Sequence, residues 1–370
     1  MANIFDYLAW RGDLDFKTSP FNPVDNIILS QLAYLTLDDI VPGPGDREGI
    51  SMELAIRIYN EKLHSPEGIK QTSFFKDDPK LINAIALSRR FGDCHLYGYI
   101  NHVDTDREIQ FAALTVYIND GTCFVSFRGT DISIVGWKEN FNMSFKEEIP
   151  SQLEAVKYLE QMASLSTGHL RVGGHSKGGN LAMFAASQCD KHVQKRIITV
   201  YSNDAPGFHE KIIESDGFNA VKNRILSFVP QSSVIGMFLK QGYDNIVIKS
   251  SQTGLMQHDL YSWEVTHNNL VHMDKATNSS RYVNKTLREW IDSFDAERRE
   301  QFIEAIYYII SKAEITSIHE LEASWFASAC KIIKSFSHID TQTKKILRNF
   351  IAELFRSAER NFDTLLINEK

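Results

Sequence analysis

This chain of 370 residues has few cysteines, no excess of basic charge and no long apolar run. The four cysteines, Cys94, Cys123, Cys189 and Cys330, are widely spaced and form no CxxC pair, so we expect reduced core thiols and no metal site. No apolar run reaches the length of about 18 residues that a membrane-spanning helix needs, and the N-terminus lacks the pattern of a secretory signal. We therefore expect a soluble, cytoplasmic protein with no transmembrane segment.

The charge balance argues against a nucleic-acid partner. Lys+Arg 40 and Asp+Glu 47 give a formal net charge of −7, and no basic patch with interleaved aromatic residues is present. A metalloenzyme and a P-loop are also disfavoured, because HExxH is missing and Lys177 precedes Gly178 instead of following it. We expect no cofactor. Hydrophobic residues make up 43% of the chain, so a sizeable core can form.

The spacing of apolar residues divides the chain into three parts. Residues 1–94 and 278–370 show helical spacing, whereas residues 95–277 alternate short strands with helices. This pattern predicts an α/β fold with a mostly parallel sheet flanked by helices, and helical additions at both ends. The C-terminal addition would serve as a cap or as an interface in a homo-oligomer. The helices predicted in the two additions cover residues 23–37, 52–63, 79–90, 286–294, 296–313, 318–336 and 341–362.

A hairpin is predicted at the start of the central part. Asn119-Asp120-Gly121 separates the apolar strands 110–118 and 122–127, and these turn residues tolerate positive φ. The other central elements are predicted as strands 170–172, 197–201, 224–228 and 246–249 and helices 152–164 and 180–188.

The strongest local signal is the segment GGHSKGGN, residues 173–180, between a short strand and an apolar helix. In such a turn Ser176 sits in a strained conformation with Oγ pushed outward, and the flanking glycines remove Cβ atoms that would collide. The N-terminus of the following helix directs N–H groups to the place where an oxyanion would form. The pattern indicates a nucleophilic serine, and a glycine-rich turn with a capping serine is the alternative.

A second segment, FRGTDISIVGW at residues 127–137, ends a predicted strand with a glycine and a threonine. The two segments, in this order, resemble the class 3 lipases of the α/β-hydrolase fold. The chain is still more similar to a bacterial family of uncharacterised hydrolase-like proteins whose nucleophile turn reads GHSKGGN. The resemblance covers about residues 95–270 and implies a lipase-like serine esterase that forms an acyl-serine intermediate.

The resemblance also implies roles for single residues. Ser176 would be the nucleophile, and the backbone N–H of Lys177 would supply one donor of the oxyanion hole. Thr130 would complete that hole, with an ordinary turn hydroxyl as the alternative. Arg128 would pair with a nearby carboxylate and fix the loop.

A nucleophilic serine needs a histidine base. In this fold the base follows the last strand of the sheet, and His258 fits this place best. His267 and His272 are alternatives, more typical of polar residues on the approach to the C-terminal helices.

The acid that orients the base departs from the family pattern. Class 3 lipases usually have Asp-x-Val-Pro after the strand matched by residues 224–228, but Phe228-Val229-Pro230-Gln231 holds no carboxylate. Asp204, one strand earlier, would give the chain order of an α/β-hydrolase, with an Asx turn as its alternative. Asp244 and Asp259 are the alternative acids, and a site without an acid is the third alternative.

Two functions from different classes follow. The first is a serine hydrolase that cleaves an ester, thioester or amide of a small-molecule acyl substrate, with a carboxylic ester as the first expectation. The alternative is a non-catalytic hydrolase-like module for binding or regulation. The ammonium of Lys177 would either pair with an acid or attract an anionic substrate, and pairing is favoured because a buried lysine is costly without a partner.

Overall fold

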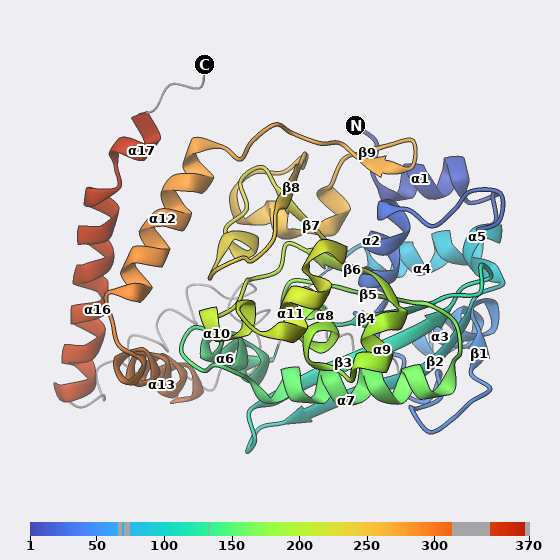
Figure 1. Ribbon diagram of the computed structural model, residues 1–370, viewed down its shortest axis with the longest axis horizontal. Helices are drawn as coiled ribbons and strands as arrows, with labels where there is room; N and C mark the ends of the chain where they lie inside the picture. Colours follow the sequence, from blue (N-terminus) through green and yellow to red (C-terminus); the bar gives the residue numbers. More distant parts are fainter. Residues whose placement is uncertain (66–68, 70–74, 132, 313–340, 367–370) are drawn as a thin grey trace.

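One eight-stranded sheet forms the centre of the molecule, with its strands side by side in chain order (Figure 1). The computed structural model describes the chain except for residues 66–68, 70–74, 132, 313–340 and 367–370. The strands are β1 (Ile50–Ser51), β2 (His95–Asp104), β3 (Ile109–Tyr117), β4 (Cys123–Phe127), β5 (Leu170–His175), β6 (Ile197–Asn203), β7 (Ile225–Pro230) and β8 (Asn245–Ile248). Strands β1 to β4 pair antiparallel and β4 to β8 pair parallel, so the sheet is mostly parallel, as predicted.

The predicted hairpin is confirmed by the antiparallel pairing of β3 with β4. Its turn contains Gly121 at φ 85°, and the N–H of Gly121 donates to Ile118 O at 3.0 Å. Strand β2 is absent from the sequence-based prediction. Its pairing with β3 shifts register between Tyr97 and Ile100, where Gly98 has φ 69°. A Cβ on Gly98 would lie 2.4 Å from a sulfur atom of the neighbouring helix, which explains why glycine is needed here. The bulge interrupts the alternation of apolar and polar residues that would have revealed the strand.

Helices of the N-terminal part cover one face of the sheet. They are α1 (Ile4–Arg11), α2 (Pro23–Leu32), α3 (Met52–Leu63), α4 (Asp78–Ala86) and α5 (Arg89–Gly92). The central one, α2, packs on β4 and β5 and is buried from residue 24 to its end. It begins at the cap Asn22, whose Oδ1 accepts from the N–H of Val24 at 3.0 Å. It is shorter than the predicted helix 23–37, because the N–H of Tyr34 donates to Gln31 O, three residues earlier, which ends α-helical pairing.

The opposite face is covered by α7 (Pro150–Leu165) and α8 (Lys177–Gln188), with α9 (Lys191–Arg196), α10 (Glu210–Ile213) and α11 (Asp216–Val221) at its flank. Neighbouring residues of β4 point to opposite faces: Phe124 belongs to the core under α2, and Val125 belongs to the core under α7 and α8. The molecule therefore has three layers, with one hydrophobic core on each side of the sheet.

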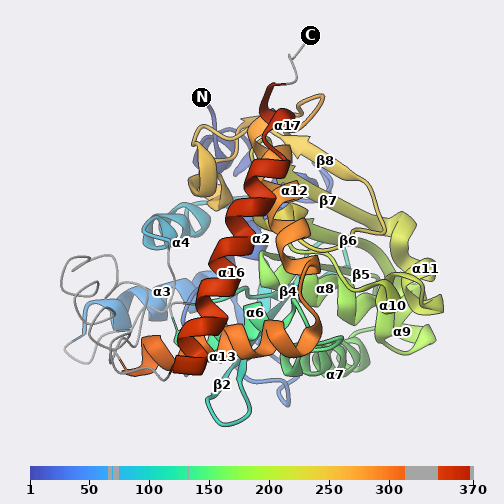
Figure 2. The same ribbon diagram turned by 90° about the vertical axis from the view of Figure 1, so that its left-hand side faces the viewer.

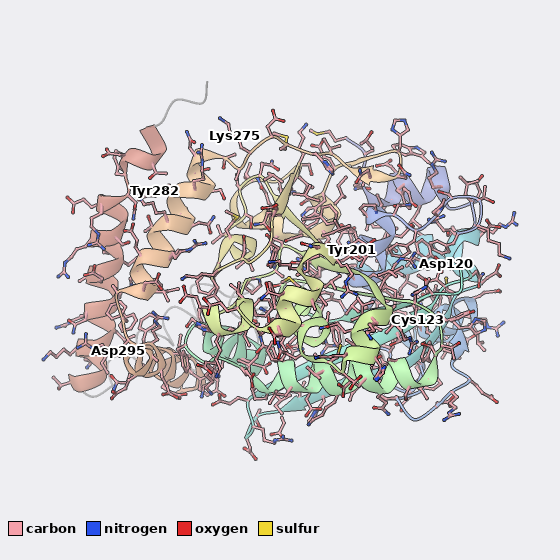
Figure 3. The ribbon with its side chains drawn as sticks, viewed as in Figure 1. Asp120, Cys123, Tyr201, Lys275, Tyr282 and Asp295 are labelled. Carbon is pink, nitrogen blue, oxygen red and sulfur yellow. The ribbon has the colours of Figure 1, made fainter. Side chains whose placement is uncertain are left out.

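The C-terminal helices stand at one edge of these layers. They are α12 (Asn278–Asp292), α13 (Ala296–Lys312), α16 (Thr341–Arg360) and α17 (Asp363–Leu366). Helix α16 runs alongside α12 (Figure 1, Figure 2), and the hydroxyl of Tyr282 donates to Ala358 O at 3.2 Å across this contact (Figure 3). Helix α13 contacts α6 (Ile134–Asn142), which follows β4. The predicted helix 318–336 lies outside the described residues.

This arrangement is an α/β-hydrolase-like fold with helical additions before and after the core, as the sequence predicted. Within the described residues, no helix is both long enough and apolar enough to cross a bilayer. The expectation of reduced core thiols is confirmed for Cys94, Cys123 and Cys189, which are buried and free. Cys330 lies outside the described residues.

Candidate active site

Ser176 occupies a sharp turn between β5 and α8. Its backbone has φ 57° and ψ −130°, a conformation that residues with a side chain rarely adopt. The turn passes very close to β4, since a Cβ added to Gly178 would lie 2.1 Å from Phe127 O. A Cβ on Gly174 would likewise lie 2.4 Å from the carbonyl carbon of Gly178. The glycines of the motif are thus required by close backbone contacts, and the predicted strained turn is present.

Ser176 is fixed by its backbone and leaves its hydroxyl available. The N–H of Ser176 donates to Asn203 O at 2.9 Å, which ties the turn to the end of β6. The side chain is half-buried, and Oγ makes no hydrogen bond with any residue that the structure describes.

His258 and Asp204 are in direct contact. His258 ends the 3₁₀ turn Gly254–His258, and its Nδ1 lies 2.6 Å from Asp204 Oδ2. Asp204 follows β6 and is buried, with φ 50°. Its other oxygen, Oδ1, accepts from Ser233 Oγ at 2.5 Å and from the N–H of Gly236 at 3.1 Å. The carboxylate is held through both oxygens, and it fixes the orientation of the imidazole.

His175 connects this pair to the turn of Ser176. Its ring centroid lies 4.3 Å from that of His258, and it directly precedes Ser176 in the chain. The His175 side chain is fully buried, with Nδ1 3.1 Å from the hydroxyl of Tyr34. Burial, and to a lesser degree the neighbouring His258, lowers the pKa of His175 well below its usual value, so this ring is neutral. Two imidazoles, tilted by 39° to each other, therefore lie side by side next to the turn of Ser176.

The loop after β4 lies against the same turn. A Cβ on Gly129 would lie 3.2 Å from Ser176 Cβ and 2.6 Å from His175 O, so glycine is needed here. The next residue, Thr130, is largely buried, and its Oγ1 has no hydrogen-bond partner among the described residues. A buried hydroxyl without a partner is uncommon in proteins.

Two cations near the turn are paired within the protein. Arg128 donates from Nη2 to Asp131 Oδ2 at 3.2 Å, which confirms the predicted carboxylate partner. Lys177 Nζ lies 2.7 Å from Glu139 Oε2, and neither side chain is exposed. The predicted pairing of Lys177 is confirmed. The alternative, in which its ammonium attracts an anionic substrate, is wrong because the ammonium is buried in this pair.

A protein-family model described as Mbeg1-like matches residues 85–308, which is more than half of the chain. The chain belongs to the Mbeg1-like family. No curated protein matches this Mbeg1-like chain at a significant level.

Solved structures similar to the Mbeg1-like protein include three lipases at low identity. A fungal lipase–inhibitor complex is 12% identical with a TM-score of 0.38, over 61% of this chain and 78% of the lipase. M37 lipase is 15% identical with a TM-score of 0.36, over 57% and 68% of the two chains. A Rhizomucor miehei lipase propeptide complex is 13% identical with a TM-score of 0.33, over 51% and 70%.

The other candidates from the sequence take no part in the 2.6 Å contact between His258 and Asp204 of the Mbeg1-like protein. Asp244 is exposed before β8, and His267 and His272 are exposed at and after the short hairpin of β9 (Val265–Thr266) and β10 (Asn269–Leu270). Asp259 caps the 3₁₀ turn Leu260–Ser262 by accepting from the N–H of Tyr261 at 3.0 Å. Burial raises the pKa of Asp259.

One pair of residues that supports the site was missed by the sequence reasoning. The amides of Asn26 and Asn203 bond in both directions, with Asn26 Nδ2 2.8 Å from Asn203 Oδ1 and Asn203 Nδ2 3.1 Å from Asn26 Oδ1. Asn203 Nδ2 also lies 3.1 Å from Gly174 O. Asn203 thereby links α2 to the turn of Ser176 and to Asp204. The signal in the sequence was the polar pair Asn26 and Ser30, which interrupts the apolar helix of the N-terminal part.

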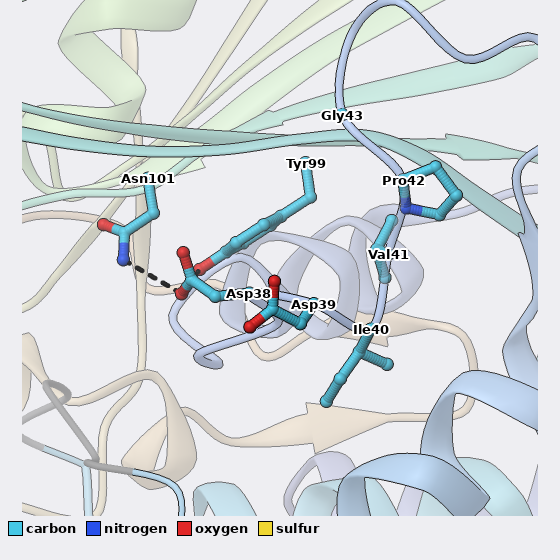
Figure 4. A pocket seen from close by; sticks show the side chains of 8 residues that line it. All are labelled: Asp38, Asp39, Ile40, Val41, Pro42, Gly43, Tyr99 and Asn101. Carbon is cyan, nitrogen blue, oxygen red and sulfur yellow. Dashed lines mark hydrogen bonds between the residues drawn. The ribbon is translucent and has the colours of Figure 1, made fainter.

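A cavity of about 450 Å³ lies beside β2 (Figure 4). It is lined by Asp38, Asp39, Ile40, Val41, Pro42, Gly43, Tyr99 and Asn101. Asn101 Nδ2 donates to Asp38 Oδ2 at 3.1 Å, and Asn101 Oδ1 accepts from Arg128 Nη2 at 2.8 Å. A chain of hydrogen bonds therefore runs from this polar cavity to the loop that contains Thr130.

Proposed function

We propose that this Mbeg1-like protein is a serine hydrolase that cleaves an ester, thioester or amide of a small-molecule acyl substrate, with a carboxylic ester as the first candidate. The observation that carries the proposal is the 2.6 Å contact between His258 Nδ1 and Asp204 Oδ2 beside the strained turn of Ser176. A serine, a histidine and a carboxylate in this chain order are the components of an acyl-transfer site in α/β-hydrolases.

The chemistry follows in two steps. His258 Nε2 takes the proton of Ser176 Oγ as the oxygen attacks the acyl carbonyl carbon. When the tetrahedral intermediate collapses, His258 returns the proton to the leaving group, and the acyl group stays on Oγ. Water then attacks the acyl-serine with His258 as base, which releases the carboxylic acid and restores the hydroxyl. Asp204 orients the imidazole and stabilises its protonated form.

The proposed oxyanion hole is supported by two features. Lys177 is the first residue of α8, so its backbone N–H is one of the donors that a helix N-terminus leaves without an intrahelical partner. Thr130 Oγ1 is buried, has no described partner and lies one residue from Gly129, which packs against Ser176. Donors fixed in this way stabilise an oxyanion without reorganisation during the reaction.

A non-catalytic hydrolase-like module is the second candidate. It is favoured by Ser176 Oγ, which makes no hydrogen bond to His258 in the structure. It is also favoured by the absence of a carboxylate in residues 228–231, where class 3 lipases usually place one.

Labelling with a fluorophosphonate distinguishes the two candidates. We expect the wild-type protein and the Ser164→Ala control, which changes an exposed serine of α7, to be labelled, and Ser176→Ala to remain unlabelled. Hydrolysis of p-nitrophenyl esters of increasing acyl length by the same three proteins would then define the substrate class. Folded wild-type protein that resists the probe would overturn the hydrolase proposal and support the module.

A further inference from the structure

The side chain of Lys177 joins three elements behind the nucleophile turn. Its Nζ donates to Gln110 O at 2.6 Å, to Gln110 Oε1 at 2.8 Å and to Glu139 Oε2 at 2.7 Å. An ammonium has three N–H donors, so every donor has a partner. Gln110 belongs to β3 and Glu139 to α6, and the turn is thereby attached to both.

Both carboxylate oxygens of Glu139 also accept hydrogen bonds. Its Oε2 also accepts from the N–H of Gln110 at 3.1 Å. Its Oε1 accepts from the N–H of Ser151 at 3.0 Å and from Ser151 Oγ. The side chains of Lys177 and Glu139 are fully buried, so the pair cannot be reached by substrate. Its role must be exerted within the protein.

The same network reaches the other side of the proposed oxyanion hole. Gln110 Nε2 donates to Gly129 O at 3.4 Å, directly before Thr130. Helix α6 rests on Thr130, since a Cβ added to Gly136 would lie 3.0 Å from Thr130 Cγ2. Glu139 is in the next turn of this helix. One set of hydrogen bonds therefore spans the segments that carry the two proposed donors.

We propose that Gln110, Glu139 and the side chain of Lys177 are positioning residues that hold the backbone N–H of Lys177 and the hydroxyl of Thr130 at the separation that an oxyanion requires. This inference rests on the proposed hydrolase function. Stability alone does not call for the pair, because apolar residues of similar volume are often as stabilising as a buried ion pair. The ion pair adds direction, which an apolar contact cannot supply.

The test uses the double variant Lys177→Met/Glu139→Gln, which removes both charges and roughly conserves volume. We expect a folded protein whose kcat for p-nitrophenyl butyrate falls about 10²-fold with KM unchanged, as for a displacement of about 1 Å in a catalytic group. Inhibition by a trifluoromethyl ketone should weaken by the same factor, because its tetrahedral adduct occupies the oxyanion hole. The control Glu304→Gln breaks a 2.7 Å ion pair with Lys138, the residue before Glu139, and should leave kcat unchanged.

A second variant tests the same inference if the double variant does not fold. Ser151→Ala removes one hydrogen bond to Glu139 without burying an unpaired charge, and we expect a decrease in kcat of about tenfold, again with KM unchanged. Folded variants with wild-type kcat and wild-type inhibition overturn the inference. So does a loss of activity that disappears when rates are divided by the titrated number of active sites, because that result shows a purely structural role. An unlabelled wild-type protein overturns the proposed function itself, before any variant is compared.

Discussion

His258 and Asp204 are 54 positions apart in the chain, and His258 Nδ1 lies 2.6 Å from Asp204 Oδ2. The contact is directional because Asp204 Oδ1 is already held by Ser233 and Gly236. The carboxylate therefore cannot rotate away without breaking three hydrogen bonds. This rigidity makes Asp204 the most informative residue to change.

We expect Asp204→Asn to lower kcat by up to about 10⁴-fold, because an amide at this place favours the wrong imidazole tautomer. Hydrolysis of p-nitrophenyl butyrate and the rate of fluorophosphonate labelling would both measure the loss. The matched control is Asp244→Asn, which changes an exposed aspartate and should keep the wild-type rate. A fully active Asp204→Asn together with an inactive Asp259→Asn would assign the acid to Asp259.

The buried His175 should make stability depend on pH. Its pKa is well below the usual value in the folded protein, whereas the unfolded chain binds a proton near about pH 6.5. Below that pH the unfolded state therefore binds more protons, and the free energy of unfolding decreases as the pH falls. We expect His175→Phe to reduce this decrease between about pH 6.5 and 5 by at most about 1.4 kcal/mol per pH unit.

Urea unfolding across this pH range would measure the effect. The control His267→Phe changes an exposed histidine and should keep the wild-type slope. Identical slopes for wild type and His175→Phe would show that His175 is not held neutral by the fold.

Gly178→Ala should destabilise the protein because the new Cβ would lie 2.1 Å from Phe127 O, a backbone atom that cannot move alone. We expect the free energy of unfolding to fall by about 2 kcal/mol or more, together with a loss of Ser176 labelling. Gly45→Ala is the matched control, since nothing lies within 4 Å of its Cβ position. Denaturant unfolding of the two variants compares them, and an equal stability would contradict the close contact between the turn and β4.

Substrate charge should have little influence on the rate, because the Lys177 ammonium is buried in an ion pair with Glu139. We expect kcat/KM for a p-nitrophenyl ester with a terminal carboxylate to be no higher than for a neutral ester of equal length. Added salt should not lower the ratio of kcat/KM for the anionic ester to kcat/KM for the neutral ester. A large preference for the anionic ester that salt abolishes would show that a cation faces the substrate.

Asn26→Leu should weaken both the fold and the site, because it leaves the buried amide of Asn203 without its reciprocal partner. We expect a loss of about 1 to 3 kcal/mol in the free energy of unfolding, and a lower kcat. Ser30→Ala is the milder comparison, since it removes the Ser30 hydroxyl, which accepts from Asn203 Nδ2 at 3.0 Å and donates to Asn26 Oδ1 at 3.1 Å, but keeps the reciprocal amide pair. If the folded Asn26→Leu variant keeps the wild-type kcat, the contact between Asn26 of α2 and Asn203 contributes to stability alone.

The parts of the site that depend on local backbone geometry could be predicted from the sequence. The turn around Ser176 needs glycines within two residues, so its motif is compact. His258 could be located because it follows the last strand of the sheet, and Asp204 because it follows a strand end. Each of these signals is contained in a short stretch of chain.

The supporting contacts could not be predicted, because they join distant segments. Lys177 was expected to pair with an acid, yet nothing local identifies Glu139, 38 positions away on a helix that the apolar spacing did not reveal. The pairing of Asn26 with Asn203 spans 177 positions. Strand β2 was missed for a different reason, since the bulge at Gly98 disrupts its alternation.

Helix α2 has a practical consequence for the limits of this protein. The family match begins at residue 85, but α2 lies before it and is buried against β4 and β5. A fragment trimmed to the region of recognisable homology would leave Phe124 open to water, along with the rest of the core beneath α2. Such a fragment would aggregate, so the boundary of homology and the boundary of independent folding are different places in this chain.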